Sequence, residues 1–466
     1  MLQTMLHLFL CLPGLTLAAA QGPDVTLTAF PKDLQLYPRD AAGHGTAQVA
    51  GSVDTPGYSS VELRVYREGV RWDLQSQPLS YAGGSAPFAF SVPVPAELAE
   101  YDFELHAVAA TASALLAAAQ DVVAGDVFLI QGQSNAVAGD GYGENLANAA
   151  QRPWIRSYGT ASIWDFKVVN DDAWGRADGE DGNVHCTIGQ WGLRMAQLLV
   201  DQTQVPVCVL NGAVGATPIK YHLRNDADPM NPASNYGRLL FRATRCGVAA
   251  AVKAIFWYQG ESNGDDYLPY AANFAELYAD WLSDYPAAEK IYVFQVHNGC
   301  GAPNQRLREL QRRFEDLYPL VDVLSTTAAP DHDGCHYRYS GYRELGNRAA
   351  RLVARDFYAS PLTQDIDAPD LERAYYSNTQ RDEITLVFRD PDDTLRFEAG
   401  AQARFTVEPA GDVRSGTVTG PNTIRLRLDG PATATSISYD YPAGSAAGIV
   451  NARGVGALTF FRARIQ

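Results

Sequence analysis

Five short apolar runs within residues 123–358 constrain the fold of this chain most strongly. The runs are Asp126–Gln131, Pro206–Leu210, Ala254–Tyr258, Ile291–Val296 and Val321–Ser325. Each is apolar at nearly every position, which is typical of a strand that is buried on both faces. Between the last three runs, apolar residues recur at helical spacing, as at Phe274, Leu277 and Trp281. Such strands alternating with helices predict an α/β fold, in which helices cover both faces of a parallel sheet.

The segments before and after this region have a different pattern. Apolar and polar residues alternate in stretches such as 61–66 and 384–388, and turn-forming residues separate these stretches. This pattern is typical of half-buried antiparallel strands and predicts a β-sandwich on each side of the α/β domain. The expected domains are a β-sandwich at residues 21–122, the α/β domain at 123–360, a linker at 361–372 and a second β-sandwich at 373–466.

The first 20 residues contain no Asp, Glu, Lys or Arg and end in three alanines. A short apolar stretch that ends in small residues predicts a secretory signal peptide, cleaved near Ala20, and an uncleaved membrane anchor is the alternative. We therefore expect a protein that is secreted, periplasmic or on the cell surface, with no transmembrane anchor once the signal is removed. Five cysteines follow this segment, so one or two disulfides are possible, but their pairing stays open.

The charge of the chain excludes some partners. Its 466 residues include 53 Asp and Glu against 37 Lys and Arg, which gives a formal net charge of −16. An acidic chain without a cluster of basic residues argues against nucleic acid and against an anionic membrane surface as partners. A neutral or small substrate is the favoured expectation.

Polar residues and glycines follow four of the predicted strands directly. The four stretches are Gln131–Ala136, Asn211–Ile219, Trp257–Asn263 and Asp331–His336. Because ligands bind beyond the carboxyl ends of parallel strands, we expect these stretches to meet at one site. Ser134 stands in the turn after the first strand, where its hydroxyl could act as a nucleophile and its N–H could help to bind an oxyanion. A helix N-cap is the alternative role for this serine.

The last of the four stretches pairs an aspartate with a histidine. Asp333 precedes His336 by three residues, so its carboxylate could fold back onto a ring nitrogen and fix the tautomer and orientation of the imidazole. His332 and His336 are four residues apart, which also leaves a metal site open as an alternative.

The sequences GQSN, GATPI, WYQGESN and DGCH, in this order, resemble those of the SGNH (GDSL-like) hydrolases. Within this superfamily they are similar to the carbohydrate esterase branch that includes sialate O-acetylesterases and acetylxylan esterases. The resemblance covers about residues 123–358. It implies a three-layer α/β/α, flavodoxin-like catalytic domain and an O-acetyl esterase that acts on a sugar or polysaccharide.

The resemblance also implies a role for individual residues. Ser134 matches the nucleophile, His336 the general base and Asp333 the residue that orients this base. The backbone N–H groups of Ser134 and Gly215 and the side-chain amide of Gln259 match the donors of the oxyanion hole. The implied reaction proceeds through an acyl-enzyme and needs neither a metal nor an organic cofactor.

Several assignments stay open at this stage. Gly212 could replace Gly215 as an oxyanion donor, because the branch usually has a second glycine where Ala216 stands here. Asn135, Glu261 and Tyr221 are candidates for substrate binding. Turn stabilisation is the favoured alternative for Asn135, a structural role suits Glu261 as well, and Tyr221 could equally belong to an ordinary surface loop.

Two other functions are compatible with the sequence. A different esterase, such as a lipase or thioesterase, could use the same scaffold, although no large apolar lid segment is visible near the motifs. A non-catalytic carbohydrate-binding surface protein is the second alternative, against which the complete set of Ser134, Asp333 and His336 argues.

Overall fold

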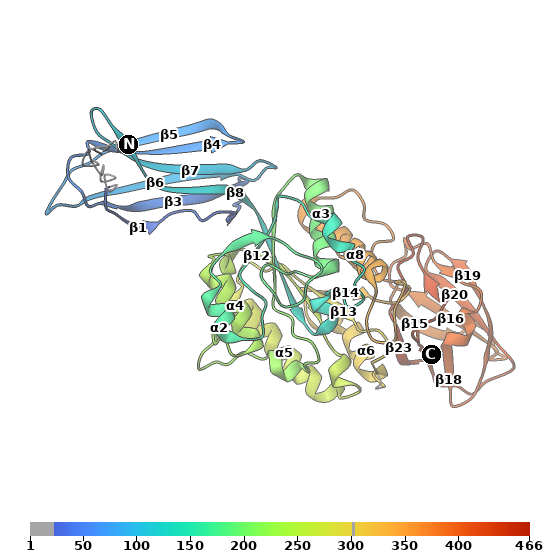
Figure 1. The fold of residues 1–466 in the computed structure, drawn as a ribbon. Coiled ribbons are helices and arrows are strands. Elements are labelled where there is room, and N and C mark those ends of the chain that lie inside the picture. The colour runs from blue at the N-terminus through green and yellow to red at the C-terminus, as the bar shows by residue number, and fades with distance from the viewer. Residues whose placement is uncertain (1–22, 301–302) are drawn as a thin grey trace, which may run out of the picture. The chain divides into compact units, whose positions relative to one another are not determined.

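The computed structural model describes residues 23–300 and 303–466 (Figure 1). The predicted signal peptide, residues 1–20, lies outside the described residues. The chain divides into two compact units. One comprises the residues up to Phe30, Gln48–Phe90 and Asp102–Ala118, and the other comprises Pro31–Ala47, Ser91–Tyr101 and Ala119–Gln466. The fold is mixed α/β, with one large mixed sheet and several smaller sheets. The domain boundaries expected from the sequence stay a prediction.

The N-terminal part of the chain forms strands only. Its strands are β1 (Val25–Ala29), β2 (Leu36–Pro38), β3 (His44–Val53), β4 (Ser60–Arg67), β5 (Val70–Pro78), β6 (Ala86–Pro95) and β7 (Tyr101–Val108). Strands β1, β3 and β6 form one sheet, while β4 pairs with β5 and β7. Burial alternates along β4, where Val61, Leu63 and Val65 are fully buried. The expected half-buried strands are therefore present, and the sandwich arrangement stays a prediction.

The large sheet contains all five of the predicted apolar strands. Its path is β10-β9-β11-β8-β12-β13-β14. Their bounds are β8 Ser113–Gly132, β9 Ile155–Tyr158, β10 Trp174–Arg176, β11 Val207–Asn211, β12 Val252–Tyr258, β13 Lys290–Gln295 and β14 Val321–Ser325. All neighbouring pairs along this path are parallel except β10 with β9. The predicted parallel sheet is confirmed, with one antiparallel strand added at its edge.

The order of the strands places the carboxyl end of β8 at a switch point. The chain continues from β8 to β9 and β11 on one side, and then crosses to β12 on the other side. At such a point the connections diverge and leave a crevice beyond the strand ends. The segments after β8, β11 and β12 therefore start beside one another.

Along the chain, helices alternate with the strands of this sheet and follow the last of them. They are α1 (Ser134–Val137), α2 (Asp165–Asn170), α3 (Gln190–Thr203), α4 (Asn235–Arg245), α5 (Tyr267–Asp284), α6 (Gln305–Arg312), α7 (Phe314–Leu317) and α8 (Tyr339–Tyr358). Short 3-10 helices are η1 (Ala147–Ala150), η2 (Ile219–His222), η3 (Ala249–Ala251), η4 (Glu261–Asn263) and η5 (Ala401–Arg404). Figure 1 shows α3 beside α8, and α4 and α5 apart from them across the strands. Trp191 of α3 packs against Phe294 of β13 with ring centroids 5.0 Å apart, which joins this helix to the sheet.

The C-terminal part of the chain returns to strands. They are β15 (Leu371–Tyr376), β16 (Glu383–Phe388), β17 (Arg396–Phe397), β18 (Phe405–Glu408), β19 (Val413–Gly420), β20 (Thr423–Leu428), β21 (Ser436–Tyr439), β22 (Ile449–Val450) and β23 (Phe460–Arg464). They form a four-stranded sheet β15-β16-β20-β19, a three-stranded sheet β18-β21-β23 and the pair β17-β22. Their apolar side chains build a second core around Ile384, Leu386 and Leu426.

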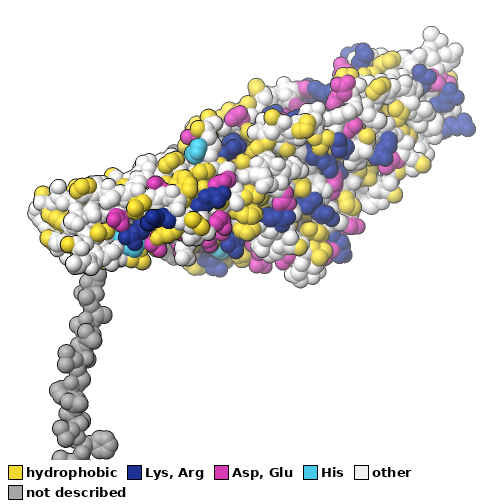
Figure 2. Space-filling model, turned by 90° about the horizontal axis from the view of Figure 1, so that it is seen from above, with side chains coloured by type: hydrophobic (Ala, Val, Ile, Leu, Met, Phe, Trp, Pro, Cys, Tyr) yellow, Lys and Arg dark blue, Asp and Glu magenta, His cyan; other side chains and the backbone are white. Residues whose placement is uncertain are grey.

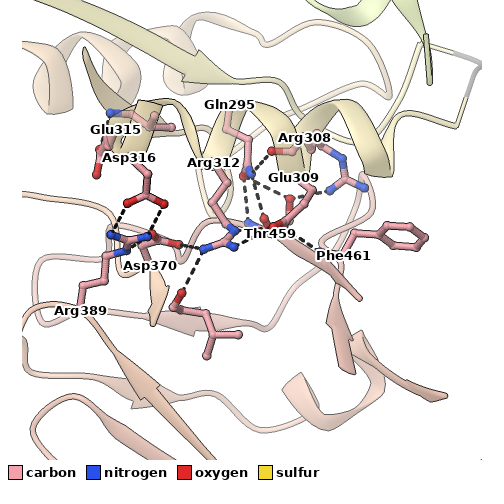
Figure 3. Close-up of polar contacts among 12 residues, drawn as sticks. Gln295, Arg308, Glu309, Arg312, Glu315, Asp316, Asp370, Arg389, Thr459 and Phe461 are labelled. Carbon is pink, nitrogen blue, oxygen red and sulfur yellow. Dashed lines mark hydrogen bonds and ion pairs between the residues drawn. The ribbon is translucent and has the colours of Figure 1, made fainter. Parts of the chain in front are cut away.

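Polar side chains join these C-terminal strands to helix α6 and strand β13 (Figure 3). Arg312 of α6 donates to Asp370 at 2.6 Å. Gln295 at the end of β13 donates to the carbonyl of Thr459 and accepts from its N–H, both at 2.9 Å. Because these groups are buried and paired, the C-terminal strands and the α/β part have a fixed mutual arrangement.

The surface carries charges of both signs. In the view of Figure 2, Lys and Arg side chains are interspersed with Asp and Glu. Within residues 23–300 and 303–466, no helix is long and apolar enough to cross a membrane.

Candidate active site

The turn after β8 brings Ser134 to the end of the sheet. Gly132 has φ +142°, and a Cβ atom at this position would lie 2.1 Å from the carbonyl oxygen of Tyr258 on the neighbouring strand. Only glycine can make this approach, which explains the glycine in the motif. The N–H of Gln133 donates to the same carbonyl at 2.9 Å, and helix α1 begins at Ser134. The serine is thus held at a fixed turn, directly beyond a buried strand.

The imidazole of His336 lies beside the hydroxyl of Ser134. His336 stands in the loop between β14 and α8, and its Nε2 is 2.9 Å from Ser134 Oγ across 202 residues of sequence. Both residues line a cavity of about 590 Å³, together with Gly215 and Asp333. The distance allows Nε2 to take the proton of the hydroxyl, which is the arrangement that activates a serine.

The carboxylate of Asp333 does not bind the imidazole as expected. Its Oδ1 accepts from the backbone N–H groups of Cys335 and His336, both at 2.7 Å, and its Oδ2 accepts from the hydroxyl of Tyr142. An aspartate that begins a turn often binds the N–H groups two and three residues further on, and this local geometry competes with the ring contact. Asp333 therefore fixes the backbone of the loop that carries His336.

The electrostatics of Asp333 follow from these contacts. Burial raises the pKa of Asp333, but hydrogen bonds from two backbone N–H groups and from Tyr142 outweigh this and lower it to about 2. The carboxylate is therefore ionised at every pH at which an esterase would be measured. Tyr142, whose ring lies under the guanidinium of Arg338 at 4.1 Å, is a site residue that the sequence did not indicate, because it stands in a loop without a motif.

Ser134 and Gly215 both line the cavity, and their backbone N–H groups are the expected oxyanion donors. Among the described residues, neither the N–H of Ser134 nor that of Gly215 donates a hydrogen bond. A Cβ atom on Gly215 would lie 3.8 Å from the Cβ of Ser134, so the two residues are neighbours. The N–H of Gly212 instead donates to the carbonyl of Ile130 at 2.8 Å. Gly215, and not Gly212, is therefore available to bind an oxyanion.

Gln259, which we expect as a third donor, has its amide bound inside the protein in this structure. Gln259 is completely buried and does not line the cavity. Its Nε2 lies within hydrogen-bonding distance of three internal acceptors, which are Gln133 Oε1, the carbonyl of Thr217 and Asn263 Oδ1. Because a side-chain amide has only two N–H groups, these acceptors occupy its donors. Gln259 links the loops after β8, β11 and β12.

The three candidates for substrate binding also lie outside the cavity. Asn135 is buried, and its Nδ2 donates to Glu261 at 2.7 Å and to the carbonyl of Cys335 at 2.9 Å. Tyr342 donates to Asn135 Oδ1 at 2.9 Å. These contacts tie the serine loop to the histidine loop, so Asn135 and Glu261 have structural roles. Tyr221 is 58% exposed in η2 and is absent from the cavity lining.

The buried carboxyl of Glu261 gives the protein a specific pH dependence. Burial raises the pKa of Glu261 to about 7, against which the amide of Asn135 acts only in part. Between about pH 4.5 and 7 the carboxyl of Glu261 is ionised in the unfolded chain but keeps its proton in the folded protein. The free energy of unfolding therefore decreases as the pH rises. This shift in pKa corresponds to a loss of about 3 kcal/mol in the free energy of unfolding.

The substitution Glu261→Gln should remove this loss of stability at high pH, because glutamine does not ionise. We expect the melting temperature of the variant to rise relative to the wild type between pH 5 and pH 8, measured by thermal unfolding at both pH values. Glu276→Gln on the surface helix α5 is the control and should show no such change. If the melting temperatures of Glu261→Gln and the wild type differed by the same amount at both pH values, this account would be contradicted.

The cysteines show one pairing that the sequence left open. Cys300 and Cys335 form a disulfide, whereas Cys186, Cys208 and Cys246 are free and buried. The disulfide ties the residue next to His336 to the segment that follows β13. The histidine loop is therefore held by the disulfide, by Asn135 and by its own aspartate.

His332 packs against a second histidine. Its ring stacks on that of His297 at 3.9 Å, and burial lowers its pKa to about 3, so the imidazole is neutral. In the described part of the chain, no group of three or more His, Cys, Asp or Glu residues is placed to hold a metal ion. The cluster beside the cavity is thus a serine with an imidazole partner and free backbone donors, as in hydrolases that use a serine nucleophile.

Comparison with known proteins identifies the family of the chain. Residues 124–355 match the model of the family described as carbohydrate esterase, sialic acid-specific acetylesterase. The chain belongs to this carbohydrate esterase family, and the protein is an ester-hydrolysing enzyme. No curated protein matches the chain.

One of the solved structures that match the chain shares its fold over most of its length. A carbohydrate acetylesterase from Xanthomonas citri has 18% sequence identity and a TM-score of 0.65, and the match covers 94% of this chain and 99% of that chain. A protein from Arabidopsis thaliana has 20% identity and a TM-score of 0.40, and covers 50% of this chain and 99% of its own. The first match shows a shared fold, including the strands that flank the α/β part.

Proposed function

We propose that the protein is a serine esterase that removes O-acetyl groups from a sugar or polysaccharide. The observation that carries this proposal is the distance of 2.9 Å between Ser134 Oγ and His336 Nε2 at the wall of a cavity. The family model and the fold of the acetylesterase from Xanthomonas citri support the acetyl ester and the carbohydrate.

The reaction follows from the position of these groups. His336 Nε2 takes the proton of Ser134 as Oγ attacks the ester carbonyl. The tetrahedral intermediate collapses when the protonated imidazole gives its proton to the departing sugar oxygen. A water molecule, activated by the same imidazole, then attacks the acyl-enzyme and releases acetate and the free serine.

The negative oxygen of the intermediate needs donors that are already in place. The backbone N–H groups of Ser134 and Gly215 supply two of them, since the structure gives them no internal partner. Losing one donor of this kind typically lowers the rate by about 10²–10³-fold. No side-chain donor is assigned, because the amide of Gln259 is used inside the protein.

Asp333 acts in this scheme by positioning the histidine loop. Its Oδ1 holds the N–H groups of Cys335 and His336, and Tyr142 holds its other oxygen. Asparagine has the same shape and keeps an acceptor oxygen for these N–H groups. Alanine removes that acceptor and frees the loop.

Asp333→Asn should therefore lower kcat by only about tenfold, and Asp333→Ala by about 10²-fold or more, because loop geometry controls the reach of Nε2. The measurement is steady-state hydrolysis of p-nitrophenyl acetate. A loss near 10⁴-fold in the asparagine variant would show instead that the carboxylate binds the imidazole directly during catalysis.

The proposal has two further parts, which were first expected from the sequence. We include an SGNH-type three-layer α/β/α catalytic domain between two β-sandwiches, which the path of the large sheet and the separate C-terminal sheets support. We also include export of the protein, which the apolar first 20 residues support. Expression of the full chain with and without residues 1–20, followed by assay of the medium or periplasm, tests this.

Acetate release from a set of O-acetylated glycans tests the function directly. We expect release from acetylated sialosides or acetylated xylan fragments by the wild type. A series of p-nitrophenyl esters should show a preference for acetate over long acyl chains. A preference for long chains would indicate a lipase or thioesterase, and no hydrolysis of any ester would contradict the proposal.

A further inference from the structure

A second cavity adjoins the one that contains Ser134. It has a volume of about 510 Å³. It is lined by residues of two segments, which are Thr160, Ser162, Phe166, Lys167, Asn170 and Asp171 from one, and Asn183, Val184 and His185 from the other. The first cavity is lined by Asp181, Gly182 and Asn183 of the same loop. Asn183 lines both cavities, while residues 181–182 line only the first and residues 184–185 only the second. We call this loop, residues 181–185, the shared wall.

The shared wall is fixed in place. Asn183 has φ +58°, in the left-handed region, and its Nδ2 donates to the carbonyls of Ala161 and Ala213, both at 3.1 Å. The backbone N–H of Ala161 donates to the carbonyl of Val184 at 3.1 Å. These contacts connect the walls of the second cavity to the segment before Gly215. Asn183 therefore has a fixed position at the junction of the two cavities.

An exposed apolar patch stands at this second cavity. We define the patch as Ile163, Trp164, Phe166 and Val169, on and just before helix α2. Their side chains are between 42% and 58% exposed, with Trp164 at 57% and Phe166 at 58%. Four large apolar side chains exposed within seven consecutive residues are unusual on a protein surface and indicate a binding site. Phe166 belongs both to the patch and to the cavity lining.

Polar groups line the same cavity as Phe166. His185 Nδ1 is 2.8 Å from Asp171 Oδ2, so both side chains are held at the cavity wall. Asn170 and Lys167 add an amide and an ammonium group to the lining. A pyranose ring presents an apolar C–H face and a rim of hydroxyls. Aromatic faces attract the former, and such side chains donate to and accept from the latter.

We propose that this second cavity and its patch form a subsite for the sugar chain that extends from the acetylated residue at Ser134. The inference rests on the proposed function and adds its substrate class, which is an oligosaccharide or polysaccharide and not a single acetylated sugar. The shared wall at Asn183 sets the direction of the chain, from the catalytic cavity toward Phe166. Binding energy gained at this subsite holds the acetyl group against the nucleophile.

Kinetics on substrates of different length test this subsite. The probes are acetylated xylotetraose and O-acetylated sialyllactose, each compared with its acetylated monosaccharide, and p-nitrophenyl acetate. In the wild type we expect kcat/KM to be higher for at least one oligosaccharide than for its monosaccharide. Trp164→Ala and Phe166→Ala should lower kcat/KM for that oligosaccharide by about tenfold each, mainly through KM. Hydrolysis of p-nitrophenyl acetate should stay unchanged.

Matched measurements separate the possible outcomes. Leu268→Ala, which removes an exposed apolar side chain from α5, is the control and should behave as wild type. Equal kcat/KM for long and short substrates in the wild type, or unchanged oligosaccharide kinetics in both patch variants, would overturn the subsite while p-nitrophenyl acetate hydrolysis leaves the esterase intact. A wild-type dimer that Phe166→Ala converts to a monomer in sedimentation, with unchanged kinetics, would overturn it in favour of self-association. Failure on every ester, by contrast, would count against the proposed function itself.

Discussion

Ser134→Ala should abolish ester hydrolysis, with kcat reduced by about 10⁴-fold or more. Ser134 Oγ is the atom that lies 2.9 Å from His336 Nε2, and the substitution removes it while leaving the backbone N–H of the same residue in place. The turn at Gly132 and the contacts of Asn135 do not involve this hydroxyl, so the fold should be retained. The measurement is steady-state hydrolysis of p-nitrophenyl acetate and of an acetylated glycan.

Ser262→Ala is the matched control for this prediction. Ser262 is exposed in η4, after β12, and its backbone N–H donates to Gln133 Oε1 at 3.0 Å. This variant should retain wild-type activity, and both variants should unfold at the wild-type temperature. Substantial activity in the folded Ser134→Ala protein would show that another group is the nucleophile.

The second large effect is expected for His336→Ala. The substitution removes the imidazole whose Nε2 lies 2.9 Å from Ser134 Oγ and takes its proton, so kcat should fall by about 10⁴-fold or more. Because the two side chains act as one unit, the double variant Ser134→Ala/His336→Ala should be no slower than either single variant.

His332→Ala provides the comparison on the same loop. The ring of His332 stacks on His297 and does not line the cavity with Ser134, so its loss should affect stability more than kcat. The measurements are kcat for p-nitrophenyl acetate and the unfolding temperature of each variant. Strictly multiplicative losses in the double variant, or a larger loss of kcat for His332→Ala than for His336→Ala, would contradict the assignment of the base.

The large sheet could be predicted because each of its central strands is recognisable from its own short apolar sequence. The five apolar runs need no partner to be recognised, and all five lie in parallel strands. Strand β9 was missed because it contains Arg156 and Ser157, polar residues that are nevertheless buried. Arg156 is compensated by the carbonyl of Leu34 and by Glu100, which are distant in sequence. Hydrophobic periodicity cannot indicate such partners.

The helical region 307–317 shows a similar limit. The spacing of Leu307, Leu310, Phe314 and Leu317 predicts one continuous helix. The structure instead has α6 and α7 with a break at Arg313. The side chains of Arg308 and Arg312 in α6 are committed to the C-terminal strands, through Thr459 and Asp370. Contacts of this kind with a distant part of the chain are not contained in a local pattern.

The candidate site was predicted in position but not in every contact. Ser134, Gly215 and His336 meet as expected, since each follows a parallel strand of one sheet. The contacts of Asp333 and Gln259 differ, because a carboxylate or an amide can bind several nearby groups with similar energy. Which of them it chooses depends on backbone geometry and on residues such as Tyr142, which the motifs do not include.

Identification of the residue that a fluorophosphonate labels tests the central claim most directly. The reagent reacts covalently with an activated serine, and mass spectrometry of the digested protein locates the adduct. We predict one adduct, on Ser134, in the wild type, and none in the His336→Ala protein. An adduct on a different residue, or an unlabelled Ser134 in protein that hydrolyses acetyl esters, would contradict the mechanism described here.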